Sequence, residues 1–214
     1  EMYGCKGSVA HHNSDIYADT APQDFYIPAS FWVMGEAWLA THIWEHFEYT
    51  GDREFLEENF EIIQDSVDFF RDFLIRADDL TLVTSPSVSP ENTYIMKDGR
   101  QGCMCEGAVM DVEILMELLE GYKKACEVLR KPGELWKQAE EILKALPPLK
   151  IGKYGQLQEW QEDYEEAEPG HRHISHLYGV YPGHSVSWKK TPELMQAAET
   201  TLKRRLASGG GHTG

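Results

Sequence analysis

Apolar side chains recur at every third or fourth position through long stretches of this chain, and this spacing constrains the fold more than any other feature. Phe55, Ile62 and Phe69 belong to one such series in residues 54–77, with acidic side chains between the apolar positions. Residues at this spacing share one face of an α-helix, so the stretch predicts an amphipathic helix that packs on a core. No segment alternates apolar and polar residues convincingly, and we expect no β-strand.

The same reasoning predicts five or six helices in total. They span residues 28 to about 50, 54–77, about 109–129, 134–146, a short stretch after the histidines near 171, and a last stretch that opens at 191–193. Thr191 followed by Pro192 is typical of a helix start, with the threonine as cap. Long loops rich in Trp, His and Pro separate the helices, and such loops are usually functional or disordered. We expect an all-α fold, a toroid of helical hairpins with a site at one rim.

Charge and composition exclude several classes of protein. The chain has 36 acidic and 20 basic residues, a formal net charge of −16. A surface of that sign repels the phosphates of nucleic acids and anionic membranes, so we expect neither as a partner. With 42% hydrophobic residues the chain can bury a core, and no apolar run reaches the ~20 residues of a membrane span. An uncharged ligand such as a sugar is compatible with these properties, and the compartment stays open.

Two features raise the question of a bound metal. His42 and His46 form an H-x-x-E-H pattern with Glu45, the inverted zinc-peptidase motif, and on a helix the two imidazoles share one face as zinc requires. Cys103 and Cys105 are separated by one residue, fewer than at the usual zinc sites. We interpret the two histidines as packing residues and predict no metal and no cofactor. A zinc peptidase is the alternative.

Glu91 is the candidate for a catalytic acid. It follows Pro90 in the stretch Ser-Pro-Ser-Val-Ser-Pro-Glu at 85–91. Pro86 and Pro90 fix φ on either side of the serines, so a stiff loop would hold the carboxyl group. An acid that protonates a leaving group needs such positioning and a partly desolvated setting. The alternative is a solvated loop glutamate.

A cluster of donors occurs later in the chain, where His171, Arg172, His173 and His176 lie within six residues. Imidazoles and a guanidinium supply directional hydrogen bonds to sugar hydroxyls or to a carboxylate. The histidine spacing matches no standard zinc pattern. We predict a hydrogen-bonding site, with a structural network or a metal site as the alternatives.

Tryptophans accompany these segments, and the apolar faces of sugar rings stack on indoles. Trp160 lies in a loop beside Glu159, and we expect it to contact the ligand. Trp38 and Trp44 recur at helical spacing, which indicates packing. The acidic run at 161–168 is expected to be a solvated face.

Taken together and in this order, the segments resemble glycoside hydrolase family 95. The matching stretches are residues 3–7, 10–15, 32–39, 42–52, 85–92, 155–160, 171–183 and 211–214. The most specific are Ser-Pro-Ser-x-Ser-Pro-Glu at 85–91 and His-Arg-His-x-Ser-His-Leu at 171–177. The resemblance implies an (α/α)6 barrel and an inverting, exo-acting α-L-fucosidase that releases terminal L-fucose from glycans. An α-L-galactosidase and a non-catalytic helical carbohydrate-binding module are further alternatives.

The resemblance also implies roles for single residues. Glu91 falls on the family's general acid, and Arg172 and His173 fall on its sugar contacts. We expect Trp160 to converge with these three on one concave surface. His171, Trp32, His12 and Asn13 complete the expected substrate-binding set.

The family's other catalytic groups do not occur in this chain. Family members activate the attacking water with an Asn-x-Asn pair and an Asp, whereas the three asparagines here are Asn13, Asn59 and Asn92. Both ends of the chain read as cuts. We therefore expect about half a barrel, truncated at both ends and inactive alone, which the rest of the same polypeptide completes with the base. Ser8 and Glu36 depart from the family's usual Trp and Gly.

Overall fold

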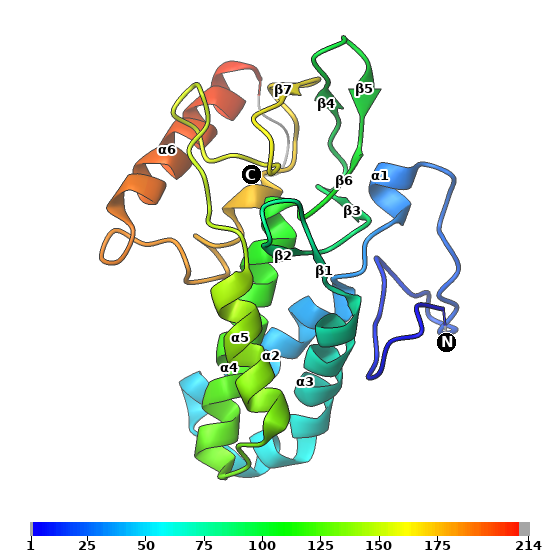
Figure 1. Ribbon diagram of the computed structural model, residues 1–214, viewed down its shortest axis with the longest axis vertical. Helices are drawn as coiled ribbons and strands as arrows, with labels where there is room; N and C mark the ends of the chain where they lie inside the picture. The colour runs from blue at the N-terminus through cyan, green and yellow to red at the C-terminus, as the bar shows by residue number, and fades with distance from the viewer. Residues whose placement is uncertain (1, 210–214) are drawn as a thin grey trace. The chain divides into compact units, whose positions relative to one another are not determined.

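Helices account for most of the regular structure in the computed structural model, which describes residues 2–209. The helices are α1 Ile27–Ser30, α2 Gly35–Thr50, α3 Arg53–Phe73, α4 Val109–Leu129, α5 Glu134–Ala145 and α6 Pro192–Ala207, with a 3-10 turn η1 at Ser175–Leu177 (Figure 1). None of the helices within residues 2–209 combines the length and the apolar character that crossing a bilayer requires.

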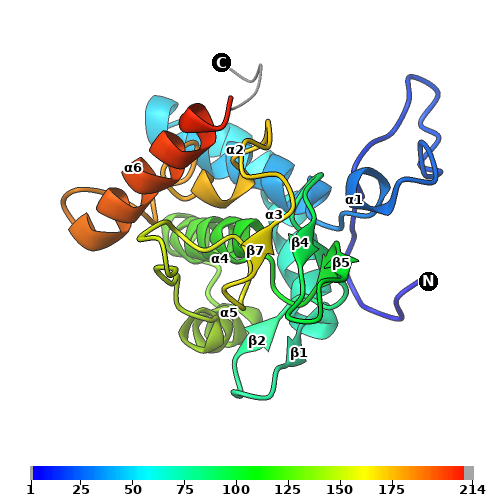
Figure 2. The ribbon, with the colours of Figure 1, turned by 90° about the horizontal axis from the view of Figure 1, so that it is seen from above.

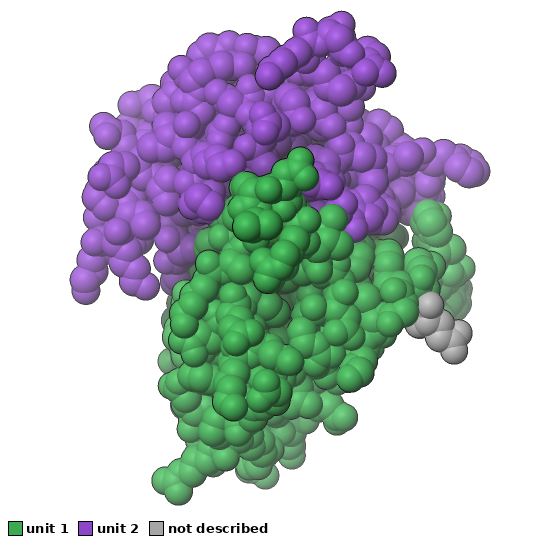
Figure 3. Space-filling view, in the orientation of Figure 1, with its two compact units in different colours: residues 1–22, 33–83, 114–147 green, residues 23–32, 84–113, 148–214 purple. Residues whose placement is uncertain are grey.

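The chain divides into two compact units, each made of several segments (Figure 3). Unit 1 contains residues 1–22, 33–83 and 114–147, and unit 2 contains residues 23–32, 84–113 and 148–214. Each unit therefore brings together residues that are far apart in the sequence.

Unit 1 is built on the amphipathic helices that the periodicity predicted. Helix α3 packs against α2 and α5. Its buried residues include Leu56, Phe60, Ile63, Val67 and Phe70. The ring of Phe60 stacks on Tyr122 of α4, with 5.8 Å between the ring centroids. At the start of α3, the Asp52 carboxylate accepts a hydrogen bond from the Phe55 N–H at 3.0 Å, which satisfies a free donor of the first turn.

The helix predicted from residue 28 to about 50 is in fact two helices. Helix α1 ends at Ser30, and α2 begins only at Gly35. A side-chain carbon at Gly35 would lie 2.2 Å from the His11 carbonyl oxygen, so α2 starts where another backbone segment passes very close. Likewise, α3 ends at Phe73 rather than near residue 77, because the chain becomes extended at Leu74.

The prediction that the chain has no strand is wrong, because within residues 2–209 seven two-residue strands form antiparallel pairs. In unit 1, β1 Ile75–Arg76 pairs with β2 Leu82–Val83. In unit 2, β3 Ser87–Val88 pairs with β6 Met104–Cys105. A three-stranded sheet of unit 2 has β4 Tyr94–Ile95 between β5 Gln101–Gly102 and β7 Glu165–Glu166 (Figure 2). Two residues are too few to show a period-two pattern in the sequence. The fold is therefore helix-rich rather than purely helical. The helices of the described residues close no barrel, and the (α/α)6 arrangement stays a prediction.

Helix α6 forms part of the core of unit 2. Its residues Ala197 and Ala198 are buried together with Leu157 and Leu177. The helix begins at Pro192 as predicted, and Thr191 occupies the cap position. Its hydroxyl, however, accepts from the Ser187 N–H at 2.9 Å and not from the helix. The threonine thus closes the preceding turn instead of capping α6.

Candidate active site

Two loops of unit 2, residues 84–93 and 168–174, line one polar cavity of about 550 Å³. The side chains at its wall include Tyr26, Glu91, Asn92, Glu168, His171 and Arg172. The Ser175 hydroxyl donates to the Pro90 carbonyl oxygen at 3.0 Å and ties the second loop to the first. A cavity of this size accommodates a small ligand such as a single sugar.

The Glu91 carboxylate lies against the predicted donor cluster. Arg172 Nη2 forms an ion pair with Glu91 Oε2, and His173 Nε2 lies 3.5 Å from the same oxygen. The Arg172 Nε–H donates to His173 Nε2 at 3.1 Å. The side chains of Glu91 and Arg172 are 24% and 42% exposed, so a ligand can reach both. The structure thus brings together Glu91, Arg172 and His173 from positions about 80 residues apart.

The two remaining histidines of the cluster are buried. His171 is 7% exposed, lines the cavity, and accepts the His173 backbone N–H at Nδ1, at 3.1 Å. His176 is 2% exposed. Burial lowers the pKa of His176 to about 4, so its ring is neutral near pH 7.

Trp160 does not lie at the cavity wall, contrary to its predicted role. It is 2% exposed and packs edge-on against Tyr94, with 5.5 Å between the centroids. Tyr164 stacks on the same tyrosine at 4.2 Å. Trp160 is therefore a core residue of unit 2, and we leave it out of the proposed sugar contacts. The sequence misled because a tryptophan in a long loop can turn either outward or into the core.

Trp32 is also buried, and it belongs to a polar network beneath the 85–91 motif. Its indole Nε1–H donates to the Asp111 carboxylate at 3.3 Å. The hydroxyls of Thr84 and Ser87 donate to the other carboxylate oxygen, each at 2.7 Å. Burial raises the pKa of Asp111 to about 6 in spite of these three hydrogen bonds. Trp32 therefore supports the loop that carries the candidate acid.

His12 and Asn13 lie in unit 1, ahead of α2, where His12 is half-buried and Asn13 exposed. Their predicted contact with the substrate stays a prediction. Unit 1 also holds the two departures from the family pattern, and these are in contact, since the Ser8 hydroxyl donates to the Glu36 carboxylate. The predicted matching stretch at 211–214 lies outside the described residues.

A buried ion pair lies close behind the candidate acid, and sequence reasoning missed it. Glu159 and Arg205 have side chains that are each 3% exposed, and Arg205 Nη2 lies 2.7 Å from Glu159 Oε2. Glu159 also accepts from the Ser89 hydroxyl at 2.6 Å and from the Asn92 amide at 3.0 Å. Burial alone would raise the pKa of Glu159, but Arg205 and these hydrogen bonds hold that pKa below its usual value.

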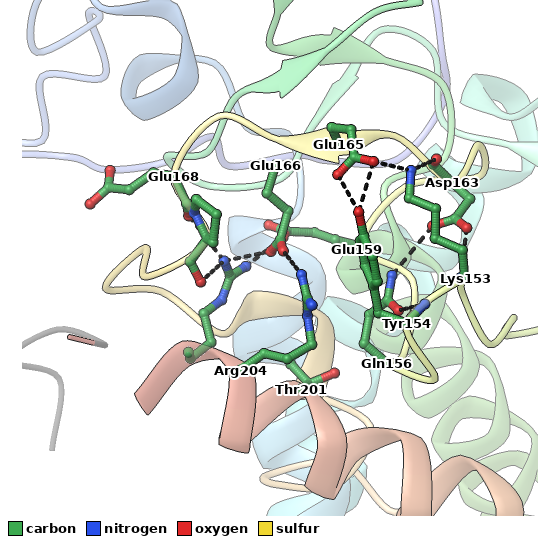
Figure 4. A network of polar contacts seen from close by, with 12 residues as sticks. Lys153, Tyr154, Gln156, Glu159, Asp163, Glu165, Glu166, Glu168, Thr201 and Arg204 are labelled. Atoms are coloured by element: carbon green, nitrogen blue, oxygen red, sulfur yellow. Dashed lines mark hydrogen bonds and ion pairs between the residues drawn. The ribbon is translucent and has the colours of Figure 1, made fainter. Parts of the chain in front are cut away.

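Two carboxylates of the acidic run at 161–168, Glu165 and Glu166, form ion pairs (Figure 4), whereas Glu162 and Glu168 are exposed. Lys153 Nζ lies 2.7 Å from Glu165 Oε1, and the Tyr154 hydroxyl donates to the same carboxylate at 2.9 Å. Arg204 Nη2 lies 3.1 Å from Glu166 Oε2. The cations come from segments before and after the run, so its local composition gave no sign of them.

The sequence did contain a signal for one of the two buried carboxylates described above, Asp111. Asp111 interrupts the apolar start of the helix predicted at 109–129, and it lies on the buried side of α4. A carboxylate at a core position of an amphipathic helix is rarely tolerated without partners. Reading that exception would have predicted the network around Asp111. Glu159 offered no such sign, because it lies in an irregular loop.

The motif that raised the question of zinc lies on α2. Both histidines are exposed on α2. The His46 ring contacts Phe55, with 4.1 Å between the centroids, so the interpretation as packing residues holds in part for His46 and is wrong for His42. Across residues 2–209, no three side chains of the His, Cys, Asp and Glu type gather where they could hold a metal ion.

Comparison with known proteins points to one family. The model of the glycosyl hydrolase family 95 catalytic domain matches residues 1–214. The chain is 40% identical over 211 residues to alpha-L-fucosidase 2 of Arabidopsis thaliana, an alignment that covers 98% of this chain and 25% of that protein. It is 29% identical over 213 residues to a probable alpha-fucosidase A of Aspergillus niger, covering 95% of this chain and 26% of that protein. The chain thus spans about a quarter of the length of these curated relatives.

Proposed function

Since the chain belongs to glycoside hydrolase family 95, we propose that the protein containing it is an α-L-fucosidase that removes terminal L-fucose from glycans with inversion at the anomeric carbon. The observation that supports this proposal is the placement of Glu91. Its carboxyl group lies at the wall of a polar cavity of about 550 Å³, beside Arg172 and His173.

Glu91 acts as the general acid in this proposal. Its carboxyl group protonates the glycosidic oxygen, and the leaving group departs as a neutral alcohol. A water molecule attacks the anomeric carbon from the opposite face, so acid and base must stand ~6.5–9.5 Å apart. We place the base outside residues 1–214, because the asparagines of this chain form no Asn-x-Asn pair.

Arg172 has two roles in the proposal, as the ion-pair partner of Glu91 before the substrate binds and as a hydrogen-bond donor to the sugar afterwards. A guanidinium beside a carboxyl group stabilises the ionised form, whereas acid catalysis needs the protonated form. We infer that sugar hydroxyls take Arg172 as their hydrogen-bond donor when the substrate binds. Arg172 then leaves Glu91, and the carboxyl group can hold the proton that the leaving oxygen receives. His171 and His173 supply further hydrogen-bonding groups at the same wall.

The natural sugar is either L-fucose or L-galactose, which differs by a hydroxyl on C6. We favour fucose because two relatives are named fucosidases. The choice is decided by the ratio of kcat/KM on matched aryl α-L-fucoside and α-L-galactoside. A ratio above ~10 in favour of the fucoside is expected if the complete site of the full-length protein fits the methyl group at C6, because such a fit leaves an added hydroxyl without a partner.

The test of the proposed reaction uses the full-length protein and a fucosylated oligosaccharide. Proton NMR at early times should show β-L-fucose as the first product, which then mutarotates. First release of the α-anomer would rule out inversion. Binding of the glycan without turnover would instead indicate a carbohydrate-binding module.

A further inference from the structure

Both loops that line the cavity are attached to one buried ion pair. Glu159 precedes Trp160 in a loop, and Arg205 lies near the end of α6. Their side chains are each 3% exposed, and neither residue lies at the cavity wall. The pair therefore acts on the cavity only through the residues it holds.

Glu159 holds the loop of the proposed acid. Its carboxylate accepts from the Ser89 hydroxyl at 2.6 Å and from the Asn92 amide at 3.0 and 3.1 Å. These two residues stand on either side of Pro90 and Glu91. Because φ of Pro90 is fixed by its ring, anchoring the residues before and after it determines where the Glu91 side chain begins.

Arg205 holds the loop of the proposed sugar contacts. Its Nη1 donates to the carbonyl oxygens of Glu168 and Pro169, both at 3.2 Å. The same nitrogen lies 2.6 Å from Glu166 Oε1. These residues directly precede the stretch from Gly170 to Arg172, so one guanidinium joins that stretch to Glu159.

Burying the charges of Glu159 and Arg205 costs free energy, so stability alone does not account for this ion pair. Removing two charges from water costs several kcal/mol per ion, and replacing a buried ion pair by apolar residues is often neutral or stabilising. The Glu159–Arg205 pair instead places its hydrogen bonds on two functional loops at once. A catalytic side chain displaced by about 1 Å can lose ~10²-fold in rate.

We propose that Glu159 and Arg205 are positioning residues for this active site, which set the placement of Glu91 relative to Arg172. The proposal rests on the proposed role of Glu91 as the acid. It assigns the pair no contact with the substrate and no proton transfer.

The test compares four variants of the full-length protein, Glu159→Gln, Arg205→Lys, Ser89→Ala and, as the matched control, Glu165→Gln. Glu165→Gln removes an ion pair to Lys153. This pair includes no residue of the loop that carries Glu91 or of the loop that carries Arg172. Folding is checked by circular dichroism and thermal midpoint. Should Glu159→Gln not fold, Arg205→Lys and Ser89→Ala carry the test, since each removes only part of the network.

On a natural glycan, kcat of Glu159→Gln should fall about 10- to 100-fold, since a misplacement of about 1 Å can cost ~10²-fold in rate. The loss should be clearly smaller on an aryl fucoside with a good leaving group, which needs no proton. Arg205→Lys and Ser89→Ala should show the same substrate dependence with smaller losses, and Glu165→Gln should match the wild type.

A double-mutant cycle separates positioning from a general structural role. In a Glu91→Gln background, Glu159→Gln should lower kcat less than twofold further, because residues that act as a unit are not additive. A full additional loss, or equal losses on both substrates, would overturn the proposal. The proposed function is tested separately by Glu91→Gln alone. If the loss of kcat in that variant is the same for good and poor leaving groups, the proposed role of Glu91 as the acid is wrong.

Discussion

At the level of single residues, two serines of the 85–91 motif donate to two different buried carboxylates. Ser87 donates to Asp111 and Ser89 to Glu159. The serines lie two positions apart and are separated by Val88, which is fully buried. Ser87, Val88 and Ser89 thus hold the loop by hydrogen bonds and burial. Glu91, at the end of the motif, lies at the cavity wall.

Replacing Glu91 by glutamine keeps the shape of the side chain and removes the transferable proton. In the full-length enzyme, Glu91→Gln should slow hydrolysis of natural glycans by roughly 10²-fold or more. Aryl fucosides with good leaving groups should lose much less, because they depart largely unaided. Steady-state kinetics on the two substrates measures the difference. Glu162→Gln, an exposed Glu→Gln change, is the matched control; unaltered glycan turnover in Glu91→Gln would remove Glu91 from the site.

Asp111 should make stability depend on pH in a defined direction. Burial raises its pKa to about 6 from 3.8, so the folded state holds the proton more tightly than the unfolded state. The resulting stabilisation is fully present below pH ~3.8 and is lost as pH rises through about 6. The thermal midpoint of the full-length wild type should therefore be higher than that of Asp111→Asn, and the difference between the two midpoints should be largest near pH 4. A gap that widens between pH 4 and pH 7 would contradict this assignment.

At the level of secondary-structure elements, the helices follow their apolar faces, and their ends follow contacts with other segments. The segment 109–129 shows the agreement, since α4 spans Val109–Leu129. The break between α1 and α2 shows the exception, because Gly35 lies against the His11 carbonyl oxygen. The helical spacing of the apolar residues by itself predicted one continuous helix across residues 31–34.

The H-x-x-E-H stretch on α2 leads to a prediction about metal content. Within residues 2–209 no third ligand gathers with His42 and His46 where a metal could bind, and the His46 ring contacts Phe55, so we expect no zinc at the two histidines. Elemental analysis of the full-length protein should find far less than one zinc per chain, and EDTA should leave the proposed fucosidase activity intact. A stoichiometric ion with Zn–N distances of ~2.0–2.1 Å to these imidazoles would favour the peptidase hypothesis instead.

At the level of the whole molecule, this chain supplies one side of the proposed chemistry. In the proposed mechanism Glu91 is the acid, and the base is expected from another part of the polypeptide. The chain spans about a quarter of the length of its curated relatives, so most of the protein in those relatives lies beyond the matched region.

Residues 1–214 produced alone should therefore hydrolyse no fucoside, while the full-length protein should be active. Inversion requires a base on the face opposite the acid, and removing it abolishes the attack by water even where Glu91 is in place. Release of aryl alcohol by both proteins under identical conditions is the measurement. Turnover by residues 1–214 would mean that a carboxylate of this chain acts as base, and Glu168 at the cavity wall would be the first to replace.

The sequence by itself predicted most of the helical segments, though not the break before α2, together with the loop of Glu91 and the donor cluster at 171–173, because each depends on neighbours a few residues away. Helical periodicity is a local property, and so is the restraint that Pro90 places on its loop. The approach of Arg172 to Glu91 was expected from the resemblance to the family, but its geometry came from the fold.

Only the tertiary structure decided the two-residue strands, the burial of Trp160 and the Glu159–Arg205 pair. The strands are too short to show a pattern, and Glu159 and Arg205 meet across 46 positions. A carboxylate in an irregular loop has no periodic pattern to show which way it faces. Whether it meets water or a buried guanidinium is determined by how the segments pack, since only packing removes it from solvent and supplies its partner.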